Sequence, residues 1–169
     1  MDVFTLGEVA ELLQAPKTRI KNWTIGRPLR IVPRILAAQG KGSRNLYSVE
    51  DVYVFALANQ LGKDGFSVKT IDGLLRLRSA NVYAEIESGR TVVERYGPAK
   101  LDLGRLVRDA YFLTLMREKD KVHPHFFVGR AAWDAVAKRE KGVHGKYILD
   151  LRTLANEIDE RIAKLRQRS

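Results

Sequence analysis

The stretch from Thr5 to Trp23 reads TLGEVAELLQAPKTRIKNW, and its spacing predicts a helix–turn–helix motif. Thr5 and Glu8 have the spacing of a capping box, in which each side chain accepts a hydrogen bond from a backbone amide at the start of a helix. One apolar helix face follows, made of Leu6, Val9, Ala10 and Leu13. Pro16 interrupts the pattern, so we expect the first helix to end before it.

A second, more polar helix is expected to open at Pro16, because proline suits the first turn of a helix, where its missing N–H would have no partner. Ile20 and Trp23 have helical spacing and face inward, which makes Trp23 a core residue rather than a stacking platform for bases. The residues left outward are Lys17, Thr18, Arg19, Lys21 and Asn22. A short polar helix in this position is the kind that enters the major groove of DNA.

A hairpin and two further helices are expected before residue 78. Short strands at 29–32 and 45–47, joined through the glycine-rich residues 40–43, predict a basic hairpin, or wing, after the second helix. Ser48 and Asp51 form another capping box, opening a helix to about Leu61 that is apolar on two faces and therefore sandwiched between other elements. Ser67 caps a fourth helix, whose predicted inward residues are Val68, Ile71, Leu74 and Leu75.

The charge distribution points to an anionic partner. The 169-residue chain has 30 Lys and Arg against 20 Asp and Glu, a net charge of +10, and no acidic residue lies between Glu11 and Glu50. Lys and Arg that reach phosphates release counterions, so such a basic stretch favours nucleic acid over a membrane surface. The predicted DNA-contacting residues are Lys17, Thr18, Arg19, Lys21, Asn22, Arg27, Arg30, Lys41, Arg44 and Tyr47. Of these, Tyr47 fits a core position as well as a phosphate contact.

Four segments within residues 3–77 resemble the MerR-type winged helix–turn–helix family. They are FTLGEVA at 4–10, RIKNW at 19–23, RNLYSVEDV at 44–52 and LGKDGFSV at 61–68. The resemblance implies sequence-specific binding to double-stranded DNA, usually as a two-fold dimer, by a transcription regulator. The sequence departs from the family pattern in several places. Residues 23–47 form a longer stretch than usual, and the usual Gly-Leu after the second helix appears only as GRPL at 26–29. Asn22 stands where an aromatic residue is usual and Lys21 where arginine is usual, and no long dimerisation helix is evident directly after the fourth helix.

The second half predicts a small α+β accessory or dimerisation domain at residues 101–169, after a connecting helix or linker at 79–100. We expect a helix to about Arg108, strands at 111–116, 126–128 and 147–149, and a helix within 131–140. The final amphipathic helix, 151–167, has a heptad seam of Leu151, Ala155, Ile158, Ile162 and Leu165. That seam fits a homodimer interface and packing on its own domain equally well.

Several classes of function find no support in the sequence. There is no cysteine, which removes disulfides and thiolate metal sites, and His123, His125 and His144 lack the spacing of a zinc site. No arrangement typical of a catalytic site stands out. We therefore expect no enzyme activity, no cofactor and no metal. No apolar run is long enough for a signal peptide or a membrane span, so we expect a cytoplasmic, nucleoid-associated protein.

The sequence thus predicts a mainly α protein with small β elements, an N-terminal winged helix–turn–helix and a small α+β region ending in an amphipathic helix. Its expected function is that of a dimeric MerR-like transcription regulator that binds double-stranded DNA, with an effector left open. The alternative is a DNA-architectural or phage-type recombination or packaging module. Less favoured is a nucleic-acid-associated enzyme that uses residues 100–150 for catalysis.

Overall fold

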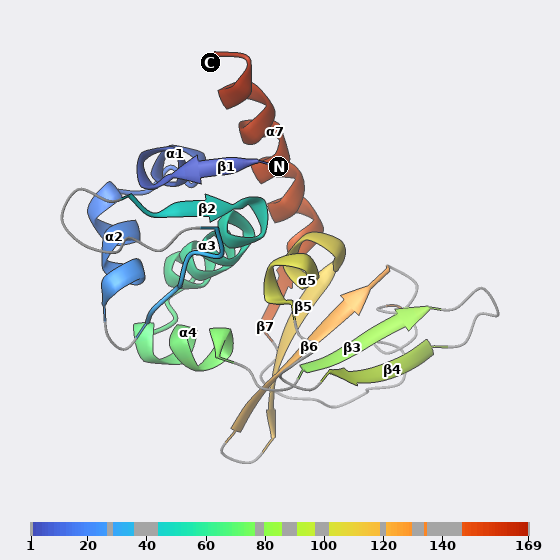
Figure 1. Cartoon of the computed structure of the whole chain (residues 1–169). Coiled ribbons are helices and arrows are strands. Elements are labelled where there is room, and N and C mark those ends of the chain that lie inside the picture. Colours follow the sequence, from blue (N-terminus) through green and yellow to red (C-terminus); the bar gives the residue numbers. More distant parts are fainter. Residues whose placement is uncertain are drawn as a thin grey trace. The chain divides into compact units, whose positions relative to one another are not determined.

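The computed structural model describes residues 2–26, 29–35, 44–76, 80–85, 91–96, 102–118, 121–129, 134 and 147–168. The chain divides into two units. Unit 1 comprises Met1–Arg76, Leu103–Val107 and Leu154–Ser169, and unit 2 comprises Leu77–Asp102 and Arg108–Thr153. Figure 1 shows the elements of both units.

The helix–turn–helix at the start of unit 1 forms as predicted. Strand β1 (Val3–Thr5) leads into α1 (Leu6–Leu12), and α2 (Lys17–Ile25) follows with Pro16 at its N-cap. The Thr5 amide donates to Glu8 Oε2 at 2.6 Å and the Glu8 amide donates to Thr5 Oγ1 at 3.4 Å, which confirms the first capping box. Ile20 and Trp23 are buried, so α2 presents its polar face outward.

The predicted hairpin pairs differently from our expectation. Strand β2 (Leu46–Ser48) lies antiparallel to β1, with Phe4 opposite Tyr47. Residues 29–32 form no strand, which corrects the prediction of a partner for β2 there. The Ile31 amide instead donates to the carbonyl of Trp23 at 2.7 Å, and Pro33 has no N–H with which to continue a ladder. The predicted glycine-rich loop at 40–43 lies outside the described residues.

Two helices build the core of unit 1. Helix α3 (Val49–Lys63) begins at the Ser48–Asp51 capping box and is buried over most of its length, as its apolar faces predicted. Helix α4 (Val68–Leu75) begins at Ser67, whose hydroxyl accepts from the Thr70 amide. Ile71 and Leu74 are buried, but Val68 is 47% exposed, because the first residue of the helix lies outside its packed face.

The C-terminal helix α7 (Leu151–Arg166) packs on its own chain. Arg161 Nη1 donates to the carbonyl of Leu12 at 3.0 Å, and the Tyr53 hydroxyl donates to Asp159. Arg166 pairs with Asp2, and Figure 1 shows the end of α7 beside β1. The predicted seam residues Leu151, Ala155, Ile158 and Ile162 are buried within the single chain, and Leu165 is half-buried. The apolar seam of α7 is therefore packed on its own chain, which is the alternative that needs no second copy.

A second returning segment completes unit 1. Helix α5 (Leu103–Asp109) contributes Leu103–Val107 to this unit. Gly104 lies so close to α3 that a Cβ on it would be 2.5 Å from the Glu50 carbonyl oxygen. Unit 1 is thus assembled from three separate stretches of the chain, and most of α7 belongs with it rather than with the accessory domain predicted at 101–169.

Unit 2 is built on a five-stranded sheet in the order β4-β3-β6-β5-β7. The strands are β3 (Ala80–Glu85), β4 (Thr91–Tyr96), β5 (Phe112–Glu118), β6 (Lys121–Val128) and β7 (Tyr147–Asp150). Neighbouring strands are antiparallel except β3 and β6, which are parallel. The buried residues of this unit include Leu113, Leu115, Phe126, Phe127 and Leu149.

The strands predicted near 111–116, 126–128 and 147–149 are confirmed, as are the helix before them and the amphipathic helix after them. The connecting helix or linker predicted at 79–100 is wrong over its described residues, which form the hairpin of β3 and β4. Val82 and Ile86 have helical spacing, but the β-branched and aromatic residues around them favour a strand once a partner strand is present. Of the helix predicted within 131–140, only Asp134 is described, and it is helical.

Candidate nucleic-acid interface

The outward face of α2 carries the polar residues that the sequence predicted for it. Lys17, Thr18, Arg19, Lys21 and Asn22 are all exposed. The helix is anchored from beneath by Ile20 and Trp23, and Thr24 adds two hydrogen bonds, to the Ile20 carbonyl at 3.1 Å and to the Tyr47 hydroxyl at 3.0 Å. Because its inner face is fixed in the core, α2 can present its outer face as a rigid surface.

A basic hollow of about 520 Å³ lies on one side of α2. Its cationic lining residues are Lys17, Lys21 and Arg44, and none of the described residues that line it is acidic. Lys17 and Lys21 lie one helical turn apart, so their ammonium groups share one face. The Lys17 ammonium also lies near Gly7, 3.9 Å from where a Cβ on that glycine would be. Cations that converge without a nearby carboxylate suit the phosphates of a nucleic-acid backbone.

A second concave surface of about 720 Å³ lies on the α4 side of α2. Thr18, Arg19 and Asn22 line it from α2, and Phe66 and Val68 line it from the start of α4. The Arg19 guanidinium donates through Nη1 to Asn59 Oδ1 at 3.3 Å. The outer face of α2 is therefore a ridge with a basic hollow on one side and a mixed polar and apolar groove on the other.

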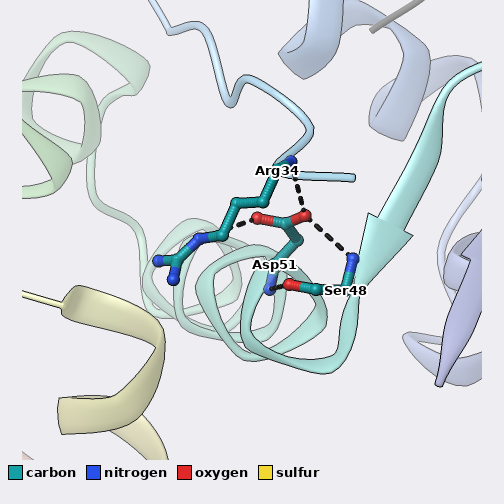
Figure 2. Close-up of polar contacts among 3 residues, drawn as sticks. All are labelled: Arg34, Ser48 and Asp51. Carbon is teal, nitrogen blue, oxygen red and sulfur yellow. Dashed lines mark hydrogen bonds and ion pairs between the residues drawn. The ribbon is translucent and has the colours of Figure 1, made fainter. Parts of the chain in front are cut away.

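The segment that follows α2 is tied to the start of α3 by one buried carboxylate, which Figure 2 shows. Asp51, whose side chain is 3% exposed, accepts from the amides of Ser48 at 2.9 Å and Arg34 at 3.0 Å, and pairs with Arg34 Nε at 3.2 Å. The Asp51 amide donates back to Ser48 Oγ at 3.2 Å. The sequence revealed the capping box but not the pairing with Arg34, because no spacing rule connects residues that far apart in a loop.

Tyr47 takes the core position, so its prediction as a DNA contact is wrong. Its side chain is 0% exposed, and its ring packs edge-on against Phe55 with centroids 5.4 Å apart. Its hydroxyl is hydrogen-bonded to Thr24 Oγ1. The pairing of β2 with β1 turns this side chain into the core of unit 1, where no phosphate can reach it.

The remaining predicted contacts are placed as follows. Arg30 and Arg44 are exposed, and Arg44 joins Lys17 and Lys21 at the basic hollow. Arg27 and Lys41 lie outside the described residues. The structure therefore brings together the outer face of α2 and Arg44, which lie far apart in the sequence.

The sequence model of the MerR HTH family regulatory protein matches residues 4–77. These residues form a MerR-type helix–turn–helix domain. This is the family that the four N-terminal segments resemble, and its members are DNA-binding transcription regulators. A search of curated proteins finds no match to the chain.

The MerR-type domain is followed by an unexpected element. After α4, the next described residues are those of strand β3, which begins at Ala80. Residues 80–85 are therefore not part of a long helix that follows α4. This agrees with the sequence, in which no long dimerisation helix is evident at that point. None of the described helices is long and apolar enough to cross a membrane.

Proposed function

We propose that the protein is a transcription regulator that binds specific sequences of double-stranded DNA with α2 in the major groove. The observation that supports this proposal is the exposed polar face of α2, Lys17–Asn22. Beside it lies a hollow lined by three cationic side chains and by no acidic residue among those described. The face has the dimensions of a single short helix, and the anchoring of Ile20 and Trp23 keeps it rigid. Its site of action is then the nucleoid in the cytoplasm.

The contacts divide into two classes. Arg19 lies in the middle of the exposed face, and its planar guanidinium can donate two parallel hydrogen bonds to guanine. Lys17, Lys21 and Arg44 converge on the hollow, which suits phosphates that position the protein without reading sequence. Specificity is therefore assigned to Arg19, with Thr18 and Asn22 beside it, and salt-dependent affinity to the hollow.

Binding-site selection with the purified full chain and a randomised duplex library tests this proposal. A regulator of this kind enriches one motif, and it binds that motif at least about a thousandfold more tightly than random duplex at physiological salt. Enrichment of no motif, together with affinity that vanishes at that salt, would contradict it. Genome-wide footprinting of the same chain then shows whether the motif lies at promoters.

The homodimer stays part of the proposal through the family resemblance, but the α7 seam does not support it. Ala155, Ile158 and Ile162 are buried within one chain and cannot also face a second copy. Sedimentation of the chain with and without its selected duplex tests the stoichiometry. Two chains on a pseudo-palindrome support the dimer, and one chain on a single half-site contradicts it.

A second function, DNA architecture, is favoured by the strand β3 at the position where the resemblance implies a dimerisation helix. An architectural or phage-type module binds many related sites weakly and bends them. Circular-permutation gel shifts separate the two functions. Strong bending at many sites with little motif enrichment supports the architectural module, whereas one enriched motif supports the regulator.

A further inference from the structure

Asn59 is a polar residue buried in the otherwise apolar middle of α3. Asn59 is only 4% exposed, and its neighbours Leu57, Ala58 and Leu61 are buried as well. A buried amide is costly unless its nitrogen and oxygen both find partners. The partners of Asn59 therefore indicate what this residue does in the fold.

The two ends of the Asn59 amide bind two different parts of the helix–turn–helix. Its Nδ2 donates to the carbonyl of Leu13, the C-cap residue of α1, at 3.3 Å. Its Oδ1 accepts from Arg19 Nη1 at 3.3 Å. The orientation of the amide follows from chemistry, because a carbonyl can only accept and a guanidinium can only donate.

Resting on the proposed function, we propose that Asn59 is a positioning residue that sets the sequence specificity of Arg19. A free arginine side chain samples many rotamers, and ordering it on DNA costs free energy. The bond from Asn59 holds the guanidinium through Nη1 before DNA is bound. Nε and Nη2 then have further N–H groups with which to contact a base edge.

The anchor on Leu13 makes Asn59 itself rigid. Because the Nδ2 bond ties the amide to the end of α1, the acceptor presented to Arg19 has a fixed place relative to both helices of the motif. A long, mobile partner could not orient Arg19 in this way. The two bonds of one side chain thus connect the turn of the motif to the residue assigned to base reading.

The test is a double-mutant cycle in the full chain, read out as base preference. Binding is measured for wild type, Asn59→Leu, Arg19→Ala and the double variant. Each protein is titrated with two duplexes: the selected duplex, and the same duplex altered at the base pair that Arg19→Ala no longer distinguishes. We expect Asn59→Leu to reduce discrimination at that base pair by about threefold to tenfold, the worth of a typical hydrogen bond. In the Arg19→Ala background, Asn59→Leu should change nothing further.

The outcomes separate the inference from the function on which it rests. If Arg19→Ala leaves all base preferences unchanged, both the proposed role of Arg19 and this inference are overturned. If Arg19→Ala relaxes one position but Asn59→Leu affects all duplexes equally, Asn59 only stabilises the fold and the inference alone is overturned. Gln60→Ala is the matched control, because Gln60 is the next residue of α3 and bonds to Asp64 instead.

Asn59→Asp covers the case in which Asn59→Leu does not fold. The carboxylate loses the donor to Leu13 but keeps an acceptor for Arg19, which the short side chain and the buried position of residue 59 on α3 still hold in place. The contribution of Asn59 to fold stability is therefore impaired while the bond to Arg19 remains. We expect a lower melting temperature with the ratio of specific to altered-duplex binding preserved within about twofold of wild type. Loss of that ratio in a folded Asn59→Asp protein contradicts the inference.

Discussion

At the residue scale, the two classes of DNA contact predict two different mutant phenotypes. Arg19→Ala should relax the preference at one base pair and cost about 1–3 kcal/mol at the selected site. Lys17→Ala should weaken binding to all duplexes alike and lower the slope of log affinity against log salt by about one. Fluorescence titrations over a range of salt concentrations measure both effects.

Lys164→Ala is the control for the loss of one exposed lysine from unit 1. Lys164 lies on α7 and lines a different concave surface from that of Lys17. It should leave the salt slope unchanged. A slope that falls equally for Lys17→Ala and Lys164→Ala would mean that net charge, not the hollow beside α2, controls DNA affinity.

Because the Asp51 carboxylate is buried and accepts several hydrogen bonds, we expect its removal to lower the stability of the protein strongly. Asp51→Ala removes the Asp51 half of the capping box of α3 and takes away the carboxylate that accepts from the Ser48 and Arg34 amides, which should cost about 2–3 kcal/mol of unfolding free energy. Urea denaturation followed by circular dichroism measures it. Glu157→Ala is the comparison, since its exposed ion pair with Arg161 should contribute at most about 0.5 kcal/mol. Equal losses from both variants would argue against a special role of Asp51.

At the element scale, the packing of α7 predicts what a charge on its buried face does. Ile158→Asp should destabilise the protein by about 3–5 kcal/mol, because it opens a cavity and buries a charge against unit 1. Thermal melting measures this loss. Asn156→Asp, on the exposed face of the same helix, should be nearly neutral. If Ile158→Asp instead converts a dimer into well-folded monomers, the seam is an interface after all.

Replacing glycine with alanine should change the stability of the protein in opposite directions at Gly104 and at Gly73. Gly104→Ala should destabilise by about 1–3 kcal/mol, because its Cβ would lie 2.5 Å from the Glu50 backbone oxygen. Gly73→Ala should stabilise by about 0.5–1 kcal/mol, since nothing lies within 4 Å of a Cβ there and alanine favours the helix. Differential scanning calorimetry of the two variants compares them. A stabilising Gly104→Ala would contradict the close packing of α5 on α3.

The elements that could be predicted from the sequence are those with local signals. Both capping boxes, Thr5–Glu8 and Ser48–Asp51, use residues three positions apart, so the bonds exist as soon as the helix forms. The strands β3 and β4 have no such local signal in the sequence, and the spacing of Val82 and Ile86 predicted a helix there instead. A strand depends on its partner, and the parallel pairing of β3 with β6 joins segments some forty residues apart.

At the scale of the whole molecule, the N-terminal sequence by itself determined the helix–turn–helix, its helix starts and the exposed polar face of α2, because caps and apolar periodicity act within a few residues. The tertiary structure alone decided that Tyr47 is buried, that Arg34 pairs with Asp51 and that Asn59 holds Arg19. It also decided which surface covers α7. A heptad seam specifies only that one face of a helix is apolar, and whether that face meets its own chain or a second copy depends on the apolar surface that folding brings next to it.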